Sequence, residues 1–392
     1  MPSAQPDVFT PFTLGGGTIK LQHRIVMAPL TRNRASPSSS HARTWVPNDL
    51  MVEYYTQRAT EGGLLISEAT PVSLQASGML GVPGLFTEEQ RVGWKKVTDA
   101  VHSKGGYIFS QAWHQGRNAH SSVSGVPVVS SSAVPITDSP HSWRGIATEP
   151  FEVPHALTVE EIASVQEDFV NAAKNAIEAG FDGVEIHAAN GYIFDQFHHN
   201  NINLRTDQYG GSIENRNRFT IETVDKIIAA IGADRFGVRL APFGFFNQTR
   251  GTEREEQWIA LCQALSNKGL AYVHLIEPRF DELRTEADKL AELSQENPMD
   301  KLEVSLRPYR EACGPDTPVI AAGGYNANNL NERLGADHDL VAMGRYFCSN
   351  GDLVDRLHTG KPLYKYDRST FYGPFEQNEI GYTVHPDQKI AA

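Results

Sequence analysis

The sequence has few cysteines, no long apolar run and fewer basic than acidic residues. Its three cysteines, Cys262, Cys313 and Cys348, are far apart and show no CxxC or Cys/His metal spacing. We therefore expect neither a disulfide framework nor a metal site, and predict reduced, buried thiols. No segment approaches the roughly 20 apolar residues of a membrane-spanning helix. The N-terminus has no basic region leading into an apolar signal segment, so a cytoplasmic location is expected.

The charge balance and composition limit the partners and the class of the protein. The formal net charge is −12 at pH 7. An average surface of this sign would repel nucleic acid and anionic membranes, so we expect neither partner. The 392 residues are 40% hydrophobic and include 33 glycines and 22 prolines. This composition is typical of a globular chain with a substantial core, and the length suits one large domain or two ordinary ones.

Short apolar runs recur along the chain and predict about eight strands. They cover residues 25–28, 64–67, 107–111, 183–187, 236–240, 271–275, 318–322 and 340–344. Segments with helical periodicity and start signals lie at 47–58, 87–103, 158–179, 212–231 and 252–267. This alternation predicts a parallel sheet that closes into a (β/α)₈ barrel, also called a TIM barrel. An open doubly wound sheet is the alternative, but no GxGxxG turn follows an early strand.

Two segments depart from the repeating pattern. Residues 14–21, with three consecutive glycines at their centre, predict a β-hairpin that plugs the barrel floor. Residues 121–154, rich in Ser, Pro and Val, form a long excursion after the third strand. We expect this excursion to lie above the active-site face, where it could cover the site. The sequence has no linker-like break or internal repeat, so residues 1–392 are predicted to form a single domain.

Polar residues gather at the ends of the predicted strands, which is where barrels of this kind carry their active sites. Thr31 follows the first strand and Gln111 ends the third. His187 ends the fourth strand, with Asn190 and Tyr192 just beyond it. These side chains are therefore candidates for binding and catalysis.

The later strands add charged and glycine residues. Arg239 lies inside an apolar strand, where it must be paired or face a ligand. Gly323-Gly324 follows the seventh strand, and the eighth ends in Gly344-Arg345. Glycines let backbone N–H groups approach an anion and an arginine adds a charged fork, so this pattern favours a phosphate site over simple turn glycines. Together with the carboxamide of the third strand, Arg239 could edge a flat heterocycle that accepts electrons; a salt bridge is the simpler alternative.

Four aromatic residues are candidates for a substrate pocket. Trp113, Tyr192, Phe280 and Tyr372 follow or lie near predicted strand ends or the C-terminus. Each could be an ordinary core residue. Grouped around a cavity, they would bind a planar apolar substrate.

Eight blocks of the sequence resemble the old yellow enzyme family of FMN-dependent ene-reductases. They are MAPLTRNRA (27–35), SEAT (67–70), QAWHQGR (111–117), EIHAANGY (185–192), LRTDQYGGSIENRNRF (204–219), AAGGY (321–325), MGRYFCSNGDL (343–353) and YDRSTFYG (366–373). They run in order through nearly the whole chain. The resemblance implies a (β/α)₈ barrel, monomeric or homodimeric, with tightly bound, non-covalent FMN. It also implies oxidation of NADPH and reduction of small-molecule activated alkenes.

The resemblance assigns roles around the flavin. Thr31 would hydrogen-bond the flavin carbonyl beside N5, and Gln111 the pyrimidine edge. Arg239 would neutralise charge near N1 and O2 of the reduced flavin. Pro29 and Ala69 would contact the ring through their main chains. The phosphate would be held by Gly324, Gly344 and Arg345.

The resemblance also assigns the substrate side. His187 and Asn190 would bind the carbonyl oxygen of an α,β-unsaturated substrate, and Tyr192 would donate the proton. The chemistry agrees, because hydride addition to the β-carbon pushes charge onto that oxygen and two preorganised donors stabilise it. A tyrosine with a pKa near 10 stays protonated at neutral pH and can act as an acid.

Several alternatives stay open at this point. The physiological oxidant could instead be a quinone, a nitro compound or a nitrate ester. A flavin-binding protein with little turnover and a flavin-free aldolase or isomerase barrel are further alternatives. Ala112 lies where family members usually carry a bulkier aliphatic residue, which leaves substrate preference open.

Overall fold

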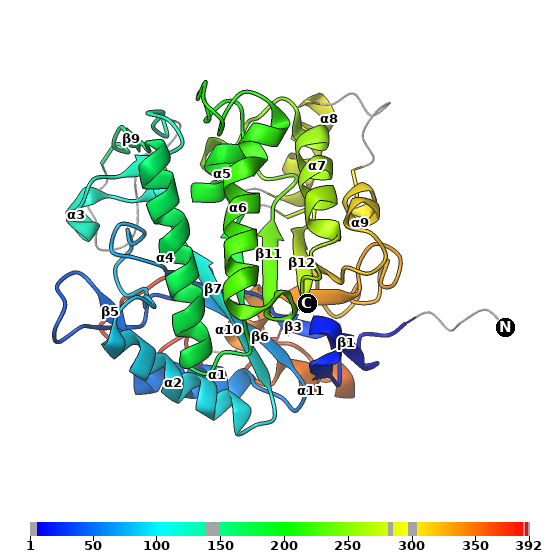
Figure 1. Ribbon diagram of the computed structural model, residues 1–392. Helices are drawn as coiled ribbons and strands as arrows, with labels where there is room; N and C mark the ends of the chain where they lie inside the picture. The colour runs from blue at the N-terminus through cyan, green and yellow to red at the C-terminus, as the bar shows by residue number, and fades with distance from the viewer. Residues whose placement is uncertain (1–5, 138–148, 281–284, 297–303, 387–388, 391–392) are drawn as a thin grey trace.

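The computed structural model describes residues 6–137, 149–280, 285–296, 304–386 and 389–390, and within these ranges the chain forms a closed barrel of parallel strands (Figure 1). Around the barrel, the strands are β3 (Ile25–Met27), β6 (Leu64–Pro71), β7 (Tyr107–Trp113), β10 (Gly183–Ala188), β11 (Phe236–Leu240), β12 (Tyr272–Ile276), β13 (Val319–Ala322) and β14 (Leu340–Met343). β14 pairs with β3 and closes the barrel. Each predicted apolar run forms one of these strands, so the (β/α)₈ prediction is confirmed and the open sheet is excluded.

The barrel strands read as continuous apolar runs because both of their faces are buried. Every residue of β10, β11 and β12 is buried, polar residues included. The main outer helices are α1 (Asp49–Arg58), α2 (Glu88–His102), α4 (Val159–Glu178), α6 (Ile213–Ile231) and α7 (Arg254–Ser266). Figure 1 shows α4, α6 and α7 side by side on one flank of the barrel.

The helix starts follow from local side-chain chemistry. The hydroxyl of Thr158 accepts a hydrogen bond from the N–H of Glu161, and the Glu161 carboxylate accepts one from the N–H of Thr158. This capping box satisfies backbone donors that the first helical turn leaves unpaired. Thr87 and Gln90 repeat the arrangement at α2. Both helices therefore begin where their sequence patterns predict.

The last third of the barrel is less regular. Two helices, α8 (Glu286–Glu296) and α9 (Arg307–Cys313), lie between β12 and β13 in the chain. Between β13 and β14, residues 323–339 are all described and form turns instead of an α-helix. Two short helices, α10 (Arg345–Ser349) and α11 (Leu353–Thr359), follow β14.

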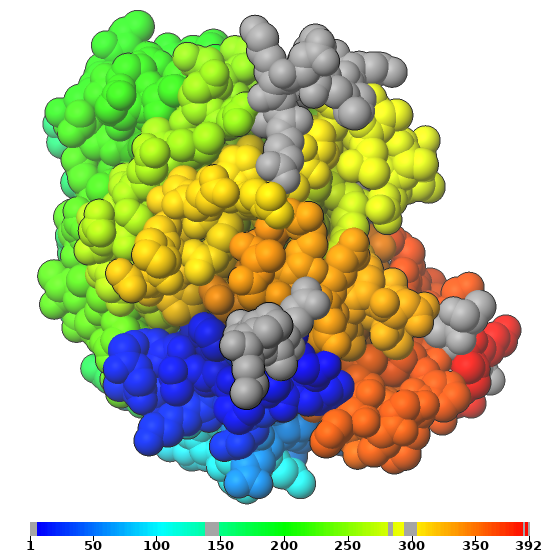
Figure 2. Space-filling view, turned by 90° about the vertical axis from the view of Figure 1, so that its right-hand side faces the viewer, coloured from blue at the N-terminus to red at the C-terminus, as the bar shows by residue number. Residues whose placement is uncertain are grey.

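The N-terminal hairpin lies at the bottom of the barrel. β1 (Phe12–Leu14) and β2 (Ile19–Leu21) pair antiparallel. Their buried side chains form one cluster with residues of the barrel strands, which include Val26, Leu64, Ile66, Phe109, Ile320 and Leu340. Figure 2 shows the N-terminal segment in blue beside later, orange parts of the chain, and the N–H of Val8 donates to Asn331 Oδ1 at 2.9 Å. The hairpin fills the N-terminal end of the barrel, so a ligand site must open at the other end.

The long excursion after β7 lies beside the loop that follows β11. It contains α3 (Ser121–Ser124) and β8 (Val129–Ser130), and β8 pairs with β9 (His155–Ala156). Residues 138–148 lie outside the described ranges. Thr137 exchanges hydrogen bonds with the Gln248 side chain at 3.1 and 3.2 Å. None of its described residues lines the cavity presented below, and whether the excursion covers the site stays a prediction.

Two expectations from composition can be compared with the structure. In the part of the chain that is described, no helix has the length and apolarity needed to cross a bilayer. Cys262, Cys313 and Cys348 are all free and buried, as predicted. Cys348 also contributes to the wall of the cavity.

Candidate active site

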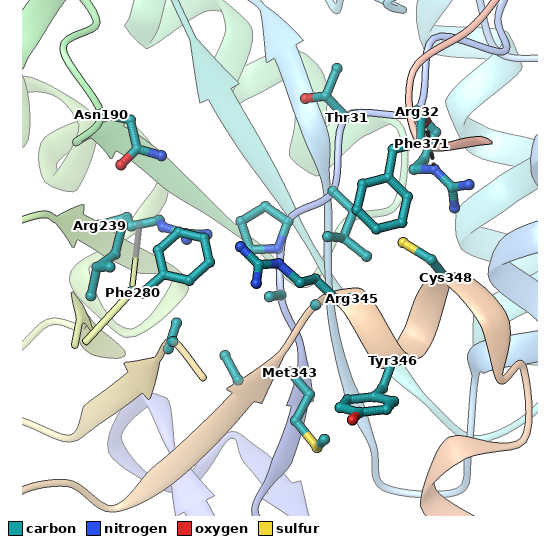
Figure 3. Close-up of a pocket in the computed structure, with 18 of the residues that line it drawn as sticks. Thr31, Arg32, Asn190, Arg239, Phe280, Met343, Arg345, Tyr346, Cys348 and Phe371 are labelled. Carbon is teal, nitrogen blue, oxygen red and sulfur yellow. Dashed lines mark hydrogen bonds between the residues drawn. The ribbon is translucent and has the colours of Figure 1, made fainter. Parts of the chain in front are cut away.

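A cavity of about 410 Å³ lies at the C-terminal ends of the barrel strands (Figure 3). Its volume is in the range of roughly 300–1,000 Å³ that is usual for small-molecule sites. Most of the residues singled out from the sequence line it, namely Pro29, Thr31, Gln111, His187, Asn190, Tyr192, Arg239, Phe280, Gly323, Gly324, Gly344, Arg345 and Tyr372. The barrel topology thus brings together side chains that are more than 300 residues apart in sequence.

Two of the proposed contact residues, Ala69 and Trp113, are not among the residues that line the cavity. They belong to a small buried cluster with Met79, Val82 and Tyr192. The Trp113 ring packs edge-on against the Tyr192 ring, with centroids 5.0 Å apart, and it is Tyr192 that lines the cavity. Direct contact of Ala69 or Trp113 with a ligand therefore stays a prediction, and the contact that the structure gives Trp113 on this side is with the Tyr192 ring.

A sharp turn after β10 brings three polar side chains to one wall. Asn190 and Gly191 adopt left-handed conformations, with φ of 58° and 74°, and α5 (Ile193–His198) begins directly after Tyr192. A Cβ atom on Gly191 would lie 2.6 Å from Cβ of Asn247, so only glycine fits there. The Asn247 amide donates to the Asn190 carbonyl at 2.8 Å. The rings of His187 and Tyr192 meet edge to face at 4.8 Å.

His187 is a neutral imidazole in this setting. Burial and the nearby positive charge of Arg239 hold the pKa of His187 well below its ordinary value of 6.5. Its Nδ1 atom is buried without a hydrogen-bond partner among the described residues. A neutral imidazole carries one donor and one acceptor, so His187 can donate to a ligand oxygen without becoming charged.

The cavity wall is cationic. Four arginines line it and, among the described residues, no aspartate or glutamate does; they are Arg32, Arg239, Arg345 and Arg368. Arg32 fixes one side, because its guanidinium donates to the carbonyls of Phe371 at 2.9 Å and Gly381 at 2.7 Å. Figure 3 shows the Arg32–Phe371 bond. This charge distribution favours an anionic ligand.

The glycines after β13 and at the end of β14 allow close approach of a ligand to the backbone. Gly323 and Gly324 have φ of 130° and 70°. A Cβ atom on Gly323 would lie 2.7 Å from Cβ of Phe280. The Arg345 guanidinium lies over the Phe280 ring, 4.9 Å from its centroid, and Figure 3 shows it reaching across the cavity. Exposed backbone N–H groups and one guanidinium are the chemistry that binds phosphate.

A buried polar layer lies below the cavity. The Gln111 amide donates to Glu185 Oε1 at 2.7 Å, and His274 Nδ1 lies 2.8 Å from Glu185 Oε2. Burial alone would raise the pKa of Glu185, but His274, Arg239 and the Gln111 hydrogen bond outweigh it and lower the pKa. Burial lowers the pKa of His274 despite the adjacent carboxylate. The layer is therefore an ionised carboxylate beside a neutral imidazole.

Sequence reasoning missed several residues of this site. His274 carried the same signal as Arg239, a polar residue inside an apolar strand, and could have been found. His274 lies below the cavity, whereas several lining residues that sequence reasoning did not single out lie in loops or short helices; they include Met79, Phe246, Tyr346, Cys348 and Phe371.

Comparison with known proteins gives a consistent set of matches. The family described as NADH:flavin oxidoreductase / NADH oxidase matches residues 7–364. Flavin oxidoreductase hxnT of Emericella nidulans is 46% identical, with 97% of each chain covered. The 12-oxophytodienoate reductase 2 of Arabidopsis thaliana is 40% identical, over 98% of this chain and 96% of that protein. The solved old yellow enzyme homologue of Zymomonas mobilis superposes with a TM-score of 0.85 at 35% identity, over 97% of this chain and 99% of that one.

Proposed function

Because the chain belongs to the NADH:flavin oxidoreductase / NADH oxidase family, which uses FMN and includes the old yellow enzymes, we propose that it is an NADPH-oxidising ene-reductase. It would saturate the C=C bond of α,β-unsaturated carbonyl compounds and related activated alkenes. The observation that carries the proposal is the convergence of His187, Asn190 and Tyr192 on one wall of an arginine-lined cavity. The relative named 12-oxophytodienoate reductase 2 supports this substrate class.

The residues of the cavity fit FMN. Positive charge without a lining carboxylate, among the described residues, suits a phosphate and a flavin that becomes anionic on reduction. Thr31 and Gln111 offer hydrogen bonds to the ring edge, and Arg239 offers charge near N1 and O2. Pro29 would contact the ring. The phosphate would be held by Gly323, Gly324, Gly344 and Arg345. When bound, FMN supplies the hydride from its N5 atom.

The chain's own residues would then polarise the alkene and protonate it. His187 and Asn190 donate hydrogen bonds to the substrate carbonyl oxygen, and these bonds strengthen as negative charge grows there. Tyr192 delivers a proton from its hydroxyl to the α-carbon. Trp113 holds the Tyr192 ring from behind. Phe280 and Tyr372 give apolar surface to a planar substrate.

An anaerobic two-step experiment tests the proposal. The purified protein should show flavin absorbance that NADPH bleaches, and 2-cyclohexenone should restore the absorbance and yield cyclohexanone. NADH compared with NADPH measures the nicotinamide preference. Absence of flavin, or bound reduced flavin that enones do not reoxidise, would refute the proposal. Product analysis with quinones, nitro compounds and nitrate esters identifies a different oxidant, because released nitrite or a reduced nitro group is not a saturated alkene.

Replacing Arg345 tests the phosphate end of the site. Arg345→Gln removes a charged fork, and a hydrogen bond to a charged group contributes about 1.5–3 kcal/mol. We expect the Kd of FMN for the apoprotein to rise roughly 10- to 100-fold, measured by flavin fluorescence titration. Arg356→Gln is the matched control, because Arg356 lies on α11 and pairs with Asp352 at 2.7 Å away from the cavity. Equal FMN affinity in the two variants would contradict the assignment.

A further inference from the structure

Glu185 is a buried carboxylate directly below the proposed flavin site. It lies in β10 two residues before His187, so the two side chains leave the same face of the strand. The strand register sets Glu185 opposite Gln111, and Arg239 opposite both His187 and His274. Glu185 and His274 have no exposed surface. A charge in such a position is retained only when its neighbours compensate it.

The contact with Glu185 determines how Gln111 presents its carboxamide. A carboxylate can only accept hydrogen bonds, so the atom of Gln111 that lies 2.7 Å from Glu185 Oε1 must be the donor Nε2. The carbonyl oxygen and the second amide hydrogen of Gln111 are then left for a ligand in the cavity. Without the carboxylate, the amide could rotate by 180° and exchange its donor and acceptor ends.

Glu185 also contributes one negative charge to the buried layer below the cavity. Its neighbours are His274, Tyr272, Gln111 and Arg239. His274 is neutral because burial lowers its pKa, and Tyr272 is neutral because burial and Glu185 raise its pKa well above 10.0. Arg239 is therefore the one cation of this layer among the described residues, and Glu185 offsets part of its charge.

We propose that Glu185 is a positioning residue that orients the Gln111 carboxamide toward the flavin pyrimidine edge and holds the reduction potential of the bound flavin down. The second effect follows because a negative charge behind Arg239 disfavours the anionic reduced flavin relative to the oxidised one. The inference rests on the proposed FMN site and adds a residue that need not touch the flavin. The effect of Glu185 on the potential requires only that the charge of the bound ring becomes more negative on reduction.

Glu185→Gln tests both parts of the proposal. The variant keeps the side-chain size but removes the charge and the obligatory acceptor. We expect the midpoint potential of the FMN-loaded variant, measured against a reference dye, to be more positive than that of the wild type. We also expect the Kd of FMN to rise roughly tenfold, because Gln111 loses its fixed orientation. Glu222→Gln is the matched control: Glu222 on α6 accepts from Gln166 on α4 at 2.9 Å and from Tyr209 at 2.8 Å, and its replacement should change neither quantity.

Glu185→Asp separates charge from orientation and serves if the glutamine variant does not fold. The aspartate keeps the charge but is one methylene too short to reach Gln111. It should therefore weaken FMN binding roughly tenfold while leaving the potential close to that of the wild type. In a double-mutant cycle that combines Glu185→Gln with Gln111→Ala, the losses in FMN affinity should be non-additive, because Glu185 acts on affinity through Gln111.

The outcomes separate this inference from the proposed function. A wild-type protein that binds no FMN would refute the proposed function and this inference with it. A wild type that binds FMN, together with Glu185 variants whose potential and FMN affinity equal those of the wild type, would overturn the role of Glu185 alone. A more positive potential for Glu185→Gln, with an unshifted Glu185→Asp, supports the inference.

Discussion

Replacing Tyr192 with phenylalanine is expected to slow alkene reduction by about 10²–10⁴-fold, the usual contribution of a positioned general acid. Reduction of the flavin by NADPH should stay nearly unchanged, because that half-reaction needs no proton from Tyr192. The substitution removes one oxygen atom and keeps the ring. The ring contacts with Trp113 at 5.0 Å and His187 at 4.8 Å should therefore persist, and FMN affinity should not change.

Stopped-flow absorbance of the two half-reactions measures this difference directly. Flavin bleaching after mixing with NADPH reports the first half-reaction, and its recovery on mixing with an enone reports the second. Tyr309→Phe is the matched control: Tyr309 is buried on α9, and its hydroxyl makes no hydrogen bond within the described chain. Equal losses in both half-reactions of the Tyr192 variant would mean that Tyr192 has a different role.

The architecture was predictable because the same physical constraint acts on every strand. A parallel strand buried on both faces must be apolar along its whole length, so a polar residue within it stands out. Arg239 is a candidate for this reason, and His187 is one because it ends such a strand. Barrel topology then predicts that residues distant in sequence lie close together, since the carboxyl ends of all parallel strands meet at one rim.

The contacts between side chains were not predictable in the same way. Nothing in the sequence says that Tyr192 packs against Trp113 and lines the cavity, because this depends on the left-handed turn at Asn190 and Gly191. Nor does it show that Arg32 binds the carbonyls of Phe371 and Gly381, more than 300 residues later. Such contacts depend on the packing of loops, which carry no periodic signal.

Two replacements of His187 test its role as a hydrogen-bond donor on the cavity wall. His187→Ala removes a donor from the carbonyl site, and losing one such donor lowers a rate by about 10²–10³-fold. We expect alkene reduction to fall by this amount and phenols, which imitate the charged enolate oxygen, to bind more weakly. His187→Asn keeps an N–H group near the same place and should recover part of both losses. Unchanged phenol affinity in the alanine variant would contradict the role of His187.

The pH dependence of phenol binding tests the protonation state of His187. Its folded-state pKa lies well below the ordinary 6.5 because burial and Arg239 disfavour the imidazolium. The folded-state imidazole is therefore neutral at pH 6.5 and above. As the pH falls, His187 is protonated in the unfolded chain before it is protonated in the folded chain. The contribution of His187 to stability is therefore fully present above pH 6.5 and falls as the pH drops below it.

Phenol affinity is measured by titration of the flavin spectrum between about pH 6 and 8. Because His187 stays neutral over this range, the wild type and His187→Asn should show the same pH dependence of phenol affinity. An inflection near 6.5 that disappears in this variant would show that His187 takes up a proton in the site, and the donor to the substrate oxygen would then be an imidazolium.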